Sequence, residues 1–480
     1  INDASVNSGN IIYQRTSASA LNSDYTYWSS PVTGQNLSIS PSYASGMFYS
    51  YNDFAIPVDW KKETSSTEMV VGKGYIIRGP QTSSPPPPPG LYYATFTGVP
   101  NNGIKSIAIG PNGTFNLLGN PYPSAINADT FLSTNSALVE GTIYFWTHNT
   151  AIQLASSITG VDVFGNPKVG SGALAYTSDD YASYNGTGGV AVSGGGIIPT
   201  GKIAAGQAFF TTSKATGASV KFNNAMRLAG TTLADRTGTN QQFFKTKNTA
   251  KTTNAIEKDR IWLNLSNDQG AFKQTLVGYI TDATNDYDSR FDGESFDGQE
   301  FVDFYSINED KYLTIQGRAL PFDENDEVPL GFRSTIEGSF SISIDQVDGS
   351  MTNQDIFIED KLTNSITDLK AGNYTFNTAA GTFNNRFVLR YNSKTLGITD
   401  LETQTNKVVV SVKNKQIKIN SLSETINKVA IFDLLGRQIY QNNKVDSSEF
   451  LTVDFSSSHQ ALIVKTTLQN GQLVTNKIIF

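Results

Sequence analysis

The chain contains no cysteine and only two histidines among its 480 residues. Without cysteine it can form no disulfide bond, no thiolate metal site and no cysteine nucleophile. Zinc sites built from two or three histidines are excluded as well. A Ser-His-Asp hydrolase would have to use His148, and no Gly-Xaa-Ser-Xaa-Gly elbow on a strand–turn–helix unit accompanies it. We therefore expect no enzyme and no catalytic residues, with paired carboxylates for glycoside hydrolysis left open because Asp and Glu total 43.

Charge is scarce too, since 16% of the residues are charged and the net charge is -7. A nucleic-acid-binding protein concentrates positive charge on one face, so we expect no nucleic-acid partner and no docking onto anionic lipid. No apolar run reaches about 18 residues, so we expect no transmembrane segment. No signal peptide opens the chain, and strand-like sequence begins at residues 11–13. This start favours a mature chain or the C-terminal piece of a longer one.

Aromatic residues and glycine are plentiful, with 21 Tyr, 28 Phe and 41 Gly. Aromatics together with Val, Ile and Thr favour strands, and Gly and Asn favour the turns between strands. The composition predicts an all-β fold class, with several antiparallel β-sandwich domains in series. A single short helix is expected over residues 125–133, capped by Ser124.

Turn-rich and polar stretches divide the chain into domains. The expected parts are a β-rich domain at 1–236, a linker at 237–256, a β-sandwich at 257–392, a linker at 393–406 and a last domain at 407–480. Residues 261–265, 340–344 and 386–390 alternate between apolar and polar side chains. This period of two indicates strands with one buried face.

The first domain carries the signs of an internal duplication. Four segments, residues 28–31, 48–52, 71–75 and 94–96, resemble residues 118–121, 143–147, 204–208 and 220–222 in the same order. An insertion between the second and third segments of the second copy would fall in a Gly-, Ser- and Asn-rich stretch. Two copies of one unit would pack as a pseudo-symmetric pair. The alternative is chance similarity among aromatic strands.

An acidic cluster in the second domain is the best candidate for a cation site. Calcium needs six to eight oxygen ligands from a flexible loop. The candidate ligands are Asp282, Asp286, Asp288, Asp292 and Asp297, and calcium is the candidate cofactor. The fixed spacing and flanking helices of an EF-hand are missing. The alternative is a solvated acidic loop between two strands.

The last domain reads as a compact sandwich of its own. Seven strand-like runs fit into residues 407–480, separated by clear turn signals. Gly436 can supply the left-handed residue of a tight hairpin, and Asn470-Gly471 is the strongest two-residue hairpin signal in the chain. Seven short strands in so few residues predict a small immunoglobulin-like sandwich.

These hairpins and the last residues resemble the C-terminal sorting domain of proteins exported by the bacterial type IX secretion system. Residues 429–439 resemble its Gly-Arg hairpin, and residues 459–471 followed by 477–480 resemble the variant called the type C sorting signal. The commoner type A pattern has a Gly-Xaa-Tyr segment where residues 459–462 lie here. The residues that carry the resemblance are Gly436, Arg437, His459, Lys465, Gly471, Lys477, Ile478, Ile479 and Phe480.

The resemblance implies that residues 407–480 are an export and surface-attachment signal. It implies two partners, the type IX translocon and an outer-membrane β-barrel shuttle or anchor, and a location outside the cell, at the surface of the outer membrane. Residues 477–480 end the chain on an apolar strand without a polar tail, which favours a partner that pairs with this edge. The alternative is a generic accessory sandwich on an exported protein.

Two functions remain for the whole chain. The first is a secreted cell-surface protein, an adhesin or stalk segment, with a surface glycan as a candidate ligand. Exposed rings could stack on sugar faces, and the alternative for the same rings is a buried core. The candidate rings are Tyr25, Tyr27, Trp28, Tyr49 and Tyr51. The second function is a secreted glycan-acting enzyme whose catalytic domain lies upstream or within residues 1–236.

Overall fold

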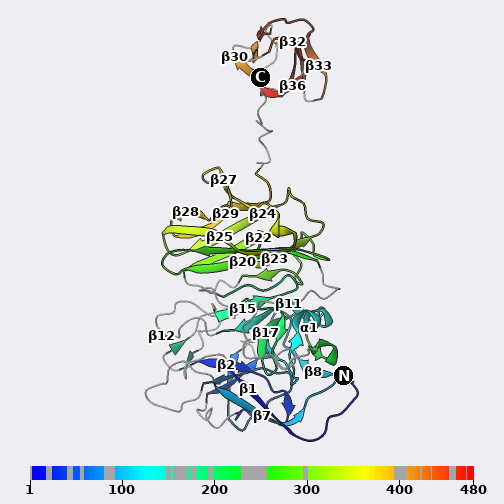
Figure 1. The fold of residues 1–480 in the computed structure, drawn as a ribbon, viewed down its shortest axis with the longest axis vertical. Helices are drawn as coiled ribbons and strands as arrows, with labels where there is room; N and C mark the ends of the chain where they lie inside the picture. The colour runs from blue at the N-terminus through cyan, green and yellow to red at the C-terminus, as the bar shows by residue number, and fades with distance from the viewer. Residues whose placement is uncertain are drawn as a thin grey trace. The chain divides into compact units, whose positions relative to one another are not determined.

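The computed structural model of the protein is shown in Figure 1. The structure describes residues 3–17, 24–39, 47–54, 59–79, 92–147, 153–154, 170–171, 174–175, 180–192, 198–228, 257–295, 301–393, 408–413, 416–421, 424–433, 435–452, 461–471 and 473–480. Contacts divide the chain into two compact units, residues 1–393 and residues 394–480. We call them the body and the terminal unit and describe each by itself. The predicted all-β fold class is confirmed, because strands dominate both units.

The body consists of a first lobe, residues 3–228, and a second lobe, residues 257–393. The predicted linker at 237–256 lies outside the described residues, as do residues 394–406 of the second linker. The strands of the first lobe are β1 (Ile11–Thr16), β2 (Tyr25–Trp28), β3 (Val32–Thr33), β4 (Phe48–Asn52), β5 (Asp59–Glu63), β6 (Tyr75–Arg78), β7 (Tyr93–Pro100), β8 (Lys105–Ala108), β9 (Phe115–Gly119), β10 (Ile126–Asn127), β11 (Val139–Trp146), β12 (Gln153–Leu154), β13 (Gly170–Ser171), β14 (Leu174–Ala175), β15 (Tyr181–Tyr184), β16 (Lys202–Ile203), β17 (Ala208–Ser213) and β18 (Ser219–Phe222).

The helical elements of this lobe are short. Those in the described residues are α1 (Ala128–Thr134) and the 3-10 turn η4 (Asn224–Met226). The cap of α1 differs from the prediction, because Asn127 and not Ser124 accepts a hydrogen bond from the Thr130 N–H group (2.8 Å). Among the described residues, no helix has the length and apolar character needed to cross a membrane.

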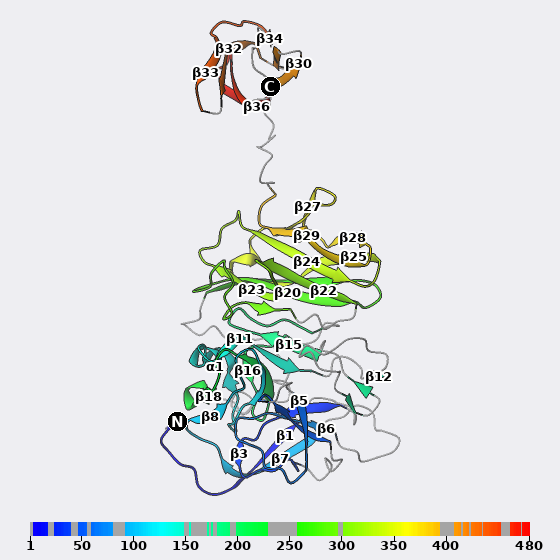
Figure 2. The same ribbon diagram turned by 180° about the vertical axis from the view of Figure 1, so that it is seen from behind.

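Two four-stranded sheets of the first lobe share one strand order. The orders are β2-β6-β4-β5 and β9-β17-β11-β15. The registers correspond as well, since Trp28 pairs with Tyr75 in one sheet and Leu118 pairs with Phe209 in the other. Outside these sheets β7 pairs with β1 and β3, and β18 pairs with β8. Figure 2 shows β1, β3 and β7 together at one end of the lobe.

The two halves also exchange equivalent hydrogen bonds. Ser29 N–H donates to the Gly206 carbonyl oxygen, and Gly119 N–H donates to that of Gly72, both over 2.9 Å. Both acceptor glycines have positive φ angles, 75° for Gly206 and 86° for Gly72. The halves are therefore related by an approximate two-fold axis. One of the four segment pairs taken from the sequence, residues 71–75 with 204–208, needs a shift of one residue to bring these two glycines together.

Aromatic side chains fill the space between the two four-stranded sheets. Tyr27 stacks on Trp146 with a centroid distance of 5.3 Å, and Tyr51 meets Phe210 edge to face at 5.0 Å. This layer contains most of the rings that the sequence offered as candidates for sugar stacking. Tyr25, Tyr27, Trp28 and Tyr51 are buried, and Tyr49 is half-buried. The core interpretation therefore holds for the four buried rings, because large rings gain most when both faces are packed.

The second lobe is an eleven-stranded sheet around one hydrophobic core. Its strands are β19 (Lys258–Ser266), β20 (Phe272–Ile280), β21 (Gly293–Glu294), β22 (Val302–Asn308), β23 (Lys311–Ala319), β24 (Glu327–Ser334), β25 (Gly338–Asp348), β26 (Phe357–Asp360), β27 (Ser365–Asp368), β28 (Tyr374–Thr378) and β29 (Gly381–Arg390), with a 3-10 turn η6 (Gly349–Thr352). The order is β27-β26-β29-β24-β22-β23-β20-β19-β25-β28, with β21 pairing to β23.

This sheet curves until β28, at one end, packs against β26 and β29 near the other end, which gives the predicted sandwich packing. The Tyr374 hydroxyl of β28 donates to Asp360 of β26 over 2.7 Å, and the Phe376 and Phe387 rings lie 4.8 Å apart. One pairing departs from the antiparallel expectation, because β20 and β23 are parallel. Parallel neighbours need a long crossover, and residues 281–310 supply it.

The two lobes are joined through close backbone contacts. Trp262 Nε1 donates to the Gly189 carbonyl oxygen (2.7 Å), and Arg260 donates to that of Thr187 (3.0 Å). Gly188 lies between these contacts, and a Cβ atom there would stand 2.8 Å from the Arg260 guanidinium. The Arg260 guanidinium would have to shift to admit a side chain at residue 188, so glycine allows the closest approach. The lobes therefore form one body.

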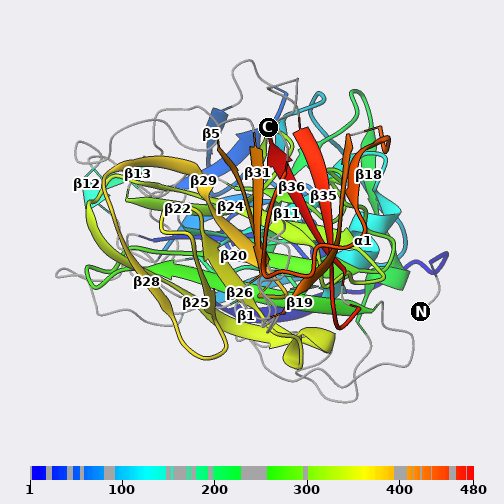
Figure 3. The same cartoon turned by 90° about the horizontal axis from the view of Figure 1, so that it is seen from above.

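The described residues of the terminal unit form seven strands in two sheets. They are β30 (Val408–Lys413), β31 (Gln416–Ser421), β32 (Ile426–Asp433), β33 (Gln438–Asn442), β34 (Glu449–Leu451), β35 (Ala461–Leu468) and β36 (Leu473–Ile479). The orders are β30-β31-β34 and β33-β32-β35-β36, and the unit has a hydrophobic core of its own. Figure 3 shows β35 and β36 side by side. This Greek-key order is the one expected of a small seven-stranded sandwich.

Candidate functional site

Two carboxylates of the acidic cluster, Asp288 and Asp292, accept hydrogen bonds from backbone N–H groups. Asp292 is 2% exposed and accepts hydrogen bonds from the backbone N–H groups of Asp288 (2.7 Å) and Gly317 (2.9 Å). Asp288 accepts from the N–H group of Arg290 (3.0 Å). Asp282 occupies a turn with a φ angle of 71°. Short acidic side chains readily bond to nearby backbone in this way, which orders the loop without an ion.

Among the described residues, no group of three or more His, Cys, Asp or Glu is placed to hold a metal ion. Asp297 lies outside the described residues, as does His148. Two further acids of the stretch are paired with lysines, Asp303 with Lys273 (3.3 Å) and Glu294 with Lys311. The predicted calcium site therefore gains no support from the geometry of Asp282, Asp286, Asp288 and Asp292.

Burial makes Asp292 a pH-sensitive group. Desolvation by burial raises the pKa of Asp292 to about 7. The hydrogen bonds from the Asp288 and Gly317 N–H groups lower the pKa but do not offset the effect of burial. An unfolded aspartate titrates near pH 3.9. Between about pH 4 and pH 7 the folded chain therefore holds a proton that the unfolded chain has lost, and stability falls as the pH rises.

We expect Asp292 to contribute a decrease of up to about 1.4 kcal/mol per pH unit in the free energy of unfolding of the body over this window. The measurement is urea denaturation of the full chain at pH 5, 6 and 7.5. D292N should flatten the decrease, and D268N, at an exposed turn, should leave it unchanged. The comparison uses the slope of stability against pH and not the absolute stability. The amide that D292N introduces has one oxygen and cannot replace both carboxylate oxygens, so D292N also loses a hydrogen bond at every pH. Equal slopes for D292N and the wild type would contradict the assignment.

The hairpin residues taken from the sorting-signal resemblance form tight turns. Gly436 and Gly471 have φ angles of 78° and 88°, the left-handed conformation that favours glycine. Arg437 Nε donates to Asp433 Oδ2 (2.7 Å), while Asp433 Oδ1 accepts from the Leu435 and Arg437 N–H groups, both over 2.9 Å. His459 lies outside the described residues.

The two lysines of the resemblance lie on the outer face of the four-stranded sheet. Lys477 of β36 is opposite Ile463 of β35, which is opposite Phe432 of β32. Lys465 Nζ lies 5.2 Å from the centroid of the Phe432 ring, at cation–π distance. Lys428, four residues before Phe432 on β32, lies on the same face. We call Lys428, Lys465 and Lys477 the lysine face.

The last residues of β36 alternate between this face and the core. Ile478 is half-buried, and Phe480 is 7% exposed in the core of the terminal unit. The unit is basic, with eight Lys and Arg against five Asp and Glu in residues 408–480, whereas the whole chain carries -7. Strand alternation in the sequence is the signal that separates the outward Lys465 and Lys477 from the inward Phe480.

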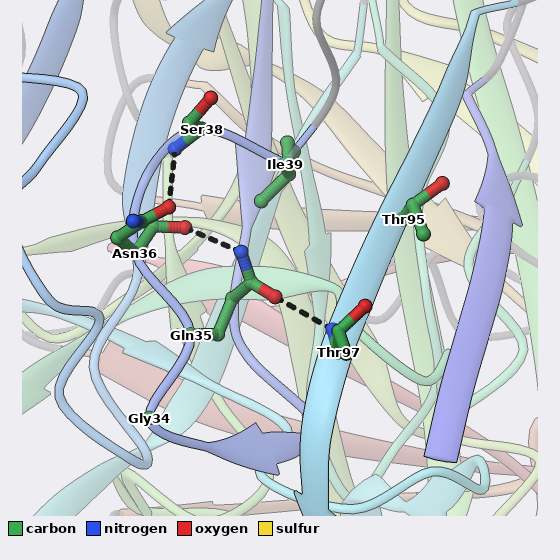
Figure 4. A pocket seen from close by; sticks show the side chains of 7 residues that line it. All are labelled: Gly34, Gln35, Asn36, Ser38, Ile39, Thr95 and Thr97. Atoms are coloured by element: carbon green, nitrogen blue, oxygen red, sulfur yellow. Dashed lines mark hydrogen bonds between the residues drawn. The ribbon is translucent and has the colours of Figure 1, made fainter. Parts of the chain in front are cut away.

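A pocket on the first lobe has no counterpart among the sequence predictions. It has a volume of about 360 Å³ and lies between residues 34–39 and the outer side of β7 (Figure 4). Gln35 fixes the wall, because its Nε2 donates to the Asn36 carbonyl oxygen (2.8 Å) and its Oε1 accepts from Thr97 N–H (2.7 Å). We call this open depression the β7 pocket. Its two walls are some 60 positions apart in sequence, so no local motif indicates it.

Two family models together cover nearly the whole chain. A domain of unknown function, DUF8693, matches residues 1–391, and a second domain of unknown function, DUF8694, matches residues 396–480. The division between them coincides with the division between the body and the terminal unit. No curated protein matches the chain.

Proposed function

We propose that this chain, which belongs to the DUF8693 family over residues 1–391, is a secreted cell-surface protein, an adhesin or stalk segment. The body is the part presented to the surroundings. The terminal unit is the signal for export by the type IX secretion system and for attachment at the outer membrane. Its partners are the translocon and an outer-membrane β-barrel shuttle or anchor.

The observation that carries the proposal is the independence of the terminal unit. It has its own core, its own family match and a net charge opposite to that of the whole chain. A unit that can fold and be recognised by itself is suited to act as an address for a separate body. The sorting-signal resemblance then names the exporter, and the outward Lys465 and Lys477 are the side chains best placed to meet it.

For the body we propose contact and not catalysis. Glycoside hydrolysis uses two carboxylates on either side of the scissile bond. The β7 pocket is lined by amides, hydroxyls and one apolar side chain, without a carboxylate. Such a lining can hold a ligand but offers no general acid.

Removal of residues 394–480 from the full chain tests the proposal in a host with a type IX system. We expect the shortened chain to remain in the periplasm, folded, because the body keeps its own cores. The measurement is proteinase accessibility on intact cells together with fractionation. Surface delivery of the shortened chain would contradict the proposal and favour the alternative that the terminal unit is a generic accessory sandwich.

A further inference from the structure

The outer face of the β1–β7 pair leaves apolar and aromatic side chains unusually exposed. Tyr93 is 64% exposed and Ile12 is 72% exposed. In the register of the two strands Ile12 is opposite Thr97, and Tyr93 and Thr95 follow on the same side of β7. The β7 pocket opens onto this row, since Thr95 and Thr97 are among its lining residues (Figure 4).

The polar groups of the pocket are available to a ligand. The side-chain oxygens of Ser38, Thr95 and Thr97 and the amide nitrogen of Asn36 bond to no residue of the described ranges. The loop that carries two of them is held in place, because Gln35 bonds to β7 and Asn36 Oδ1 accepts from Ser38 N–H (3.2 Å). The donors and acceptors are therefore positioned before a ligand arrives, which lowers the entropy lost on binding.

The chemistry of the lining indicates an uncharged ligand with many hydroxyl groups. Hydroxyls and amides both donate and accept, as sugar hydroxyls do. No Lys or Arg lines the pocket to bind an anion. The residue that forms a β-bridge with Asn36 is Glu68, an exposed acid, and a negative charge beside the pocket disfavours acidic ligands. Tyr93 offers the ring on which the apolar face of a sugar can stack.

We propose that the β7 pocket and the adjoining Tyr93 form a binding site for a neutral polysaccharide. The volume of about 360 Å³ lies at the lower end of the range for ligand pockets, which fits one or two sugar residues in the pocket with the chain continuing along β7. This inference rests on the proposed surface function, because it names the ligand class of the body.

Affinity electrophoresis of the full chain in native gels tests the site. The gels contain one of the neutral polysaccharides laminarin, xylan, amylopectin or galactomannan, or one of the polyanions alginate or heparin. We expect at least one neutral polysaccharide to retard the protein. Y93A and the hydroxyl-removing pair T95V/T97V should each weaken retardation about tenfold. F301A removes an exposed ring of the second lobe and should have no effect.

Absence of retardation by all four neutral polysaccharides would overturn the proposal, as would retardation that Y93A and T95V/T97V leave unchanged. Retardation by the polyanions alone would also overturn it and indicate an electrostatic contact elsewhere. Surface export of Y93A is measured in parallel and should match the wild type. A chain that binds but is not exported contradicts the proposed function only, and a chain that is exported but does not bind contradicts this site only.

Discussion

Replacement of Asp360 by alanine should destabilise the body by about 3–5 kcal/mol, the usual cost of leaving a buried charge unpaired. The Asp360 side chain is fully buried and that of Arg386 is 8% exposed. Arg386 Nη2 donates to Asp360 over 2.8 Å, and the Tyr374 hydroxyl and the Leu362 N–H group donate to the same carboxylate. Burial alone would raise the pKa of Asp360, but these hydrogen bonds hold it below its usual value.

The loss would come from Arg386 and not from the small side chain removed. Its guanidinium lies over the rings of Phe376 (4.6 Å) and Phe387 (4.9 Å), so without Asp360 it would remain among apolar groups with its charge uncompensated. Stability falls with acid for the same reason, because a carboxylate whose folded pKa is lowered loses its contribution as the pH drops through that pKa.

Calorimetry of the full chain measures this effect on the transition of the body. The double variant D360L/R386M should recover most of the loss, because it removes both charges together. E294Q breaks an exposed pair with Lys311 and should change stability by less than about 1 kcal/mol. A D360A transition within the error of the E294Q transition would contradict the role of the buried pair.

Replacement of Phe480 by alanine should cost the terminal unit about 3–5 kcal/mol, and removal of residues 477–480 should unfold it. Phe480 packs in a core made by both sheets, and β36 pairs with β35 through Lys477, Ile478 and Ile479. The free energy of unfolding of a domain of this size is only a few kcal/mol. Loss of either the ring or the strand end is therefore enough to melt it.

Circular dichroism of isolated residues 394–480 measures this change directly, since these residues form a compact unit with their own core. L473A lies on the same strand at a 57% exposed position and should shift the midpoint little. An F480A midpoint equal to that of L473A would show that Phe480 does not support the core. A truncation that blocks export cannot by itself identify a recognition surface, because it also unfolds the unit.

The features of this fold that local sequence indicates are those with local causes. Turn glycines and alternation over residues 408–480 suffice to place the seven strands of the terminal unit, and Gly436 and Gly471 stand where tight turns need them. The aromatic rings of the first lobe were open to two interpretations, because alternation indicates which rings share a face but not whether another sheet covers it. Tyr27, for example, is covered by Trp146 and Phe210 from the other half.

The candidate sites show the same limit. The parallel β20–β23 pair and the β7 pocket each depend on segments that meet only after the chain has folded. Asp292 belongs to an acidic run that resembles a cation site, yet the backbone of Gly317, distant in sequence, takes up its carboxylate. Spacing alone cannot distinguish a ligand from such a loop-stabilising side chain.

Surface exposure of an unrelated periplasmic passenger that carries residues 394–480 tests the central claim most directly. In a host with a type IX system, proteinase added to intact cells should cleave the passenger with the terminal unit and not the passenger alone. K465E/K477E, which reverses charge on the lysine face but leaves Phe480 in the core, should keep the unit folded and lose most of the surface signal. A passenger that stays protected in the periplasm while its terminal unit is folded would contradict the account.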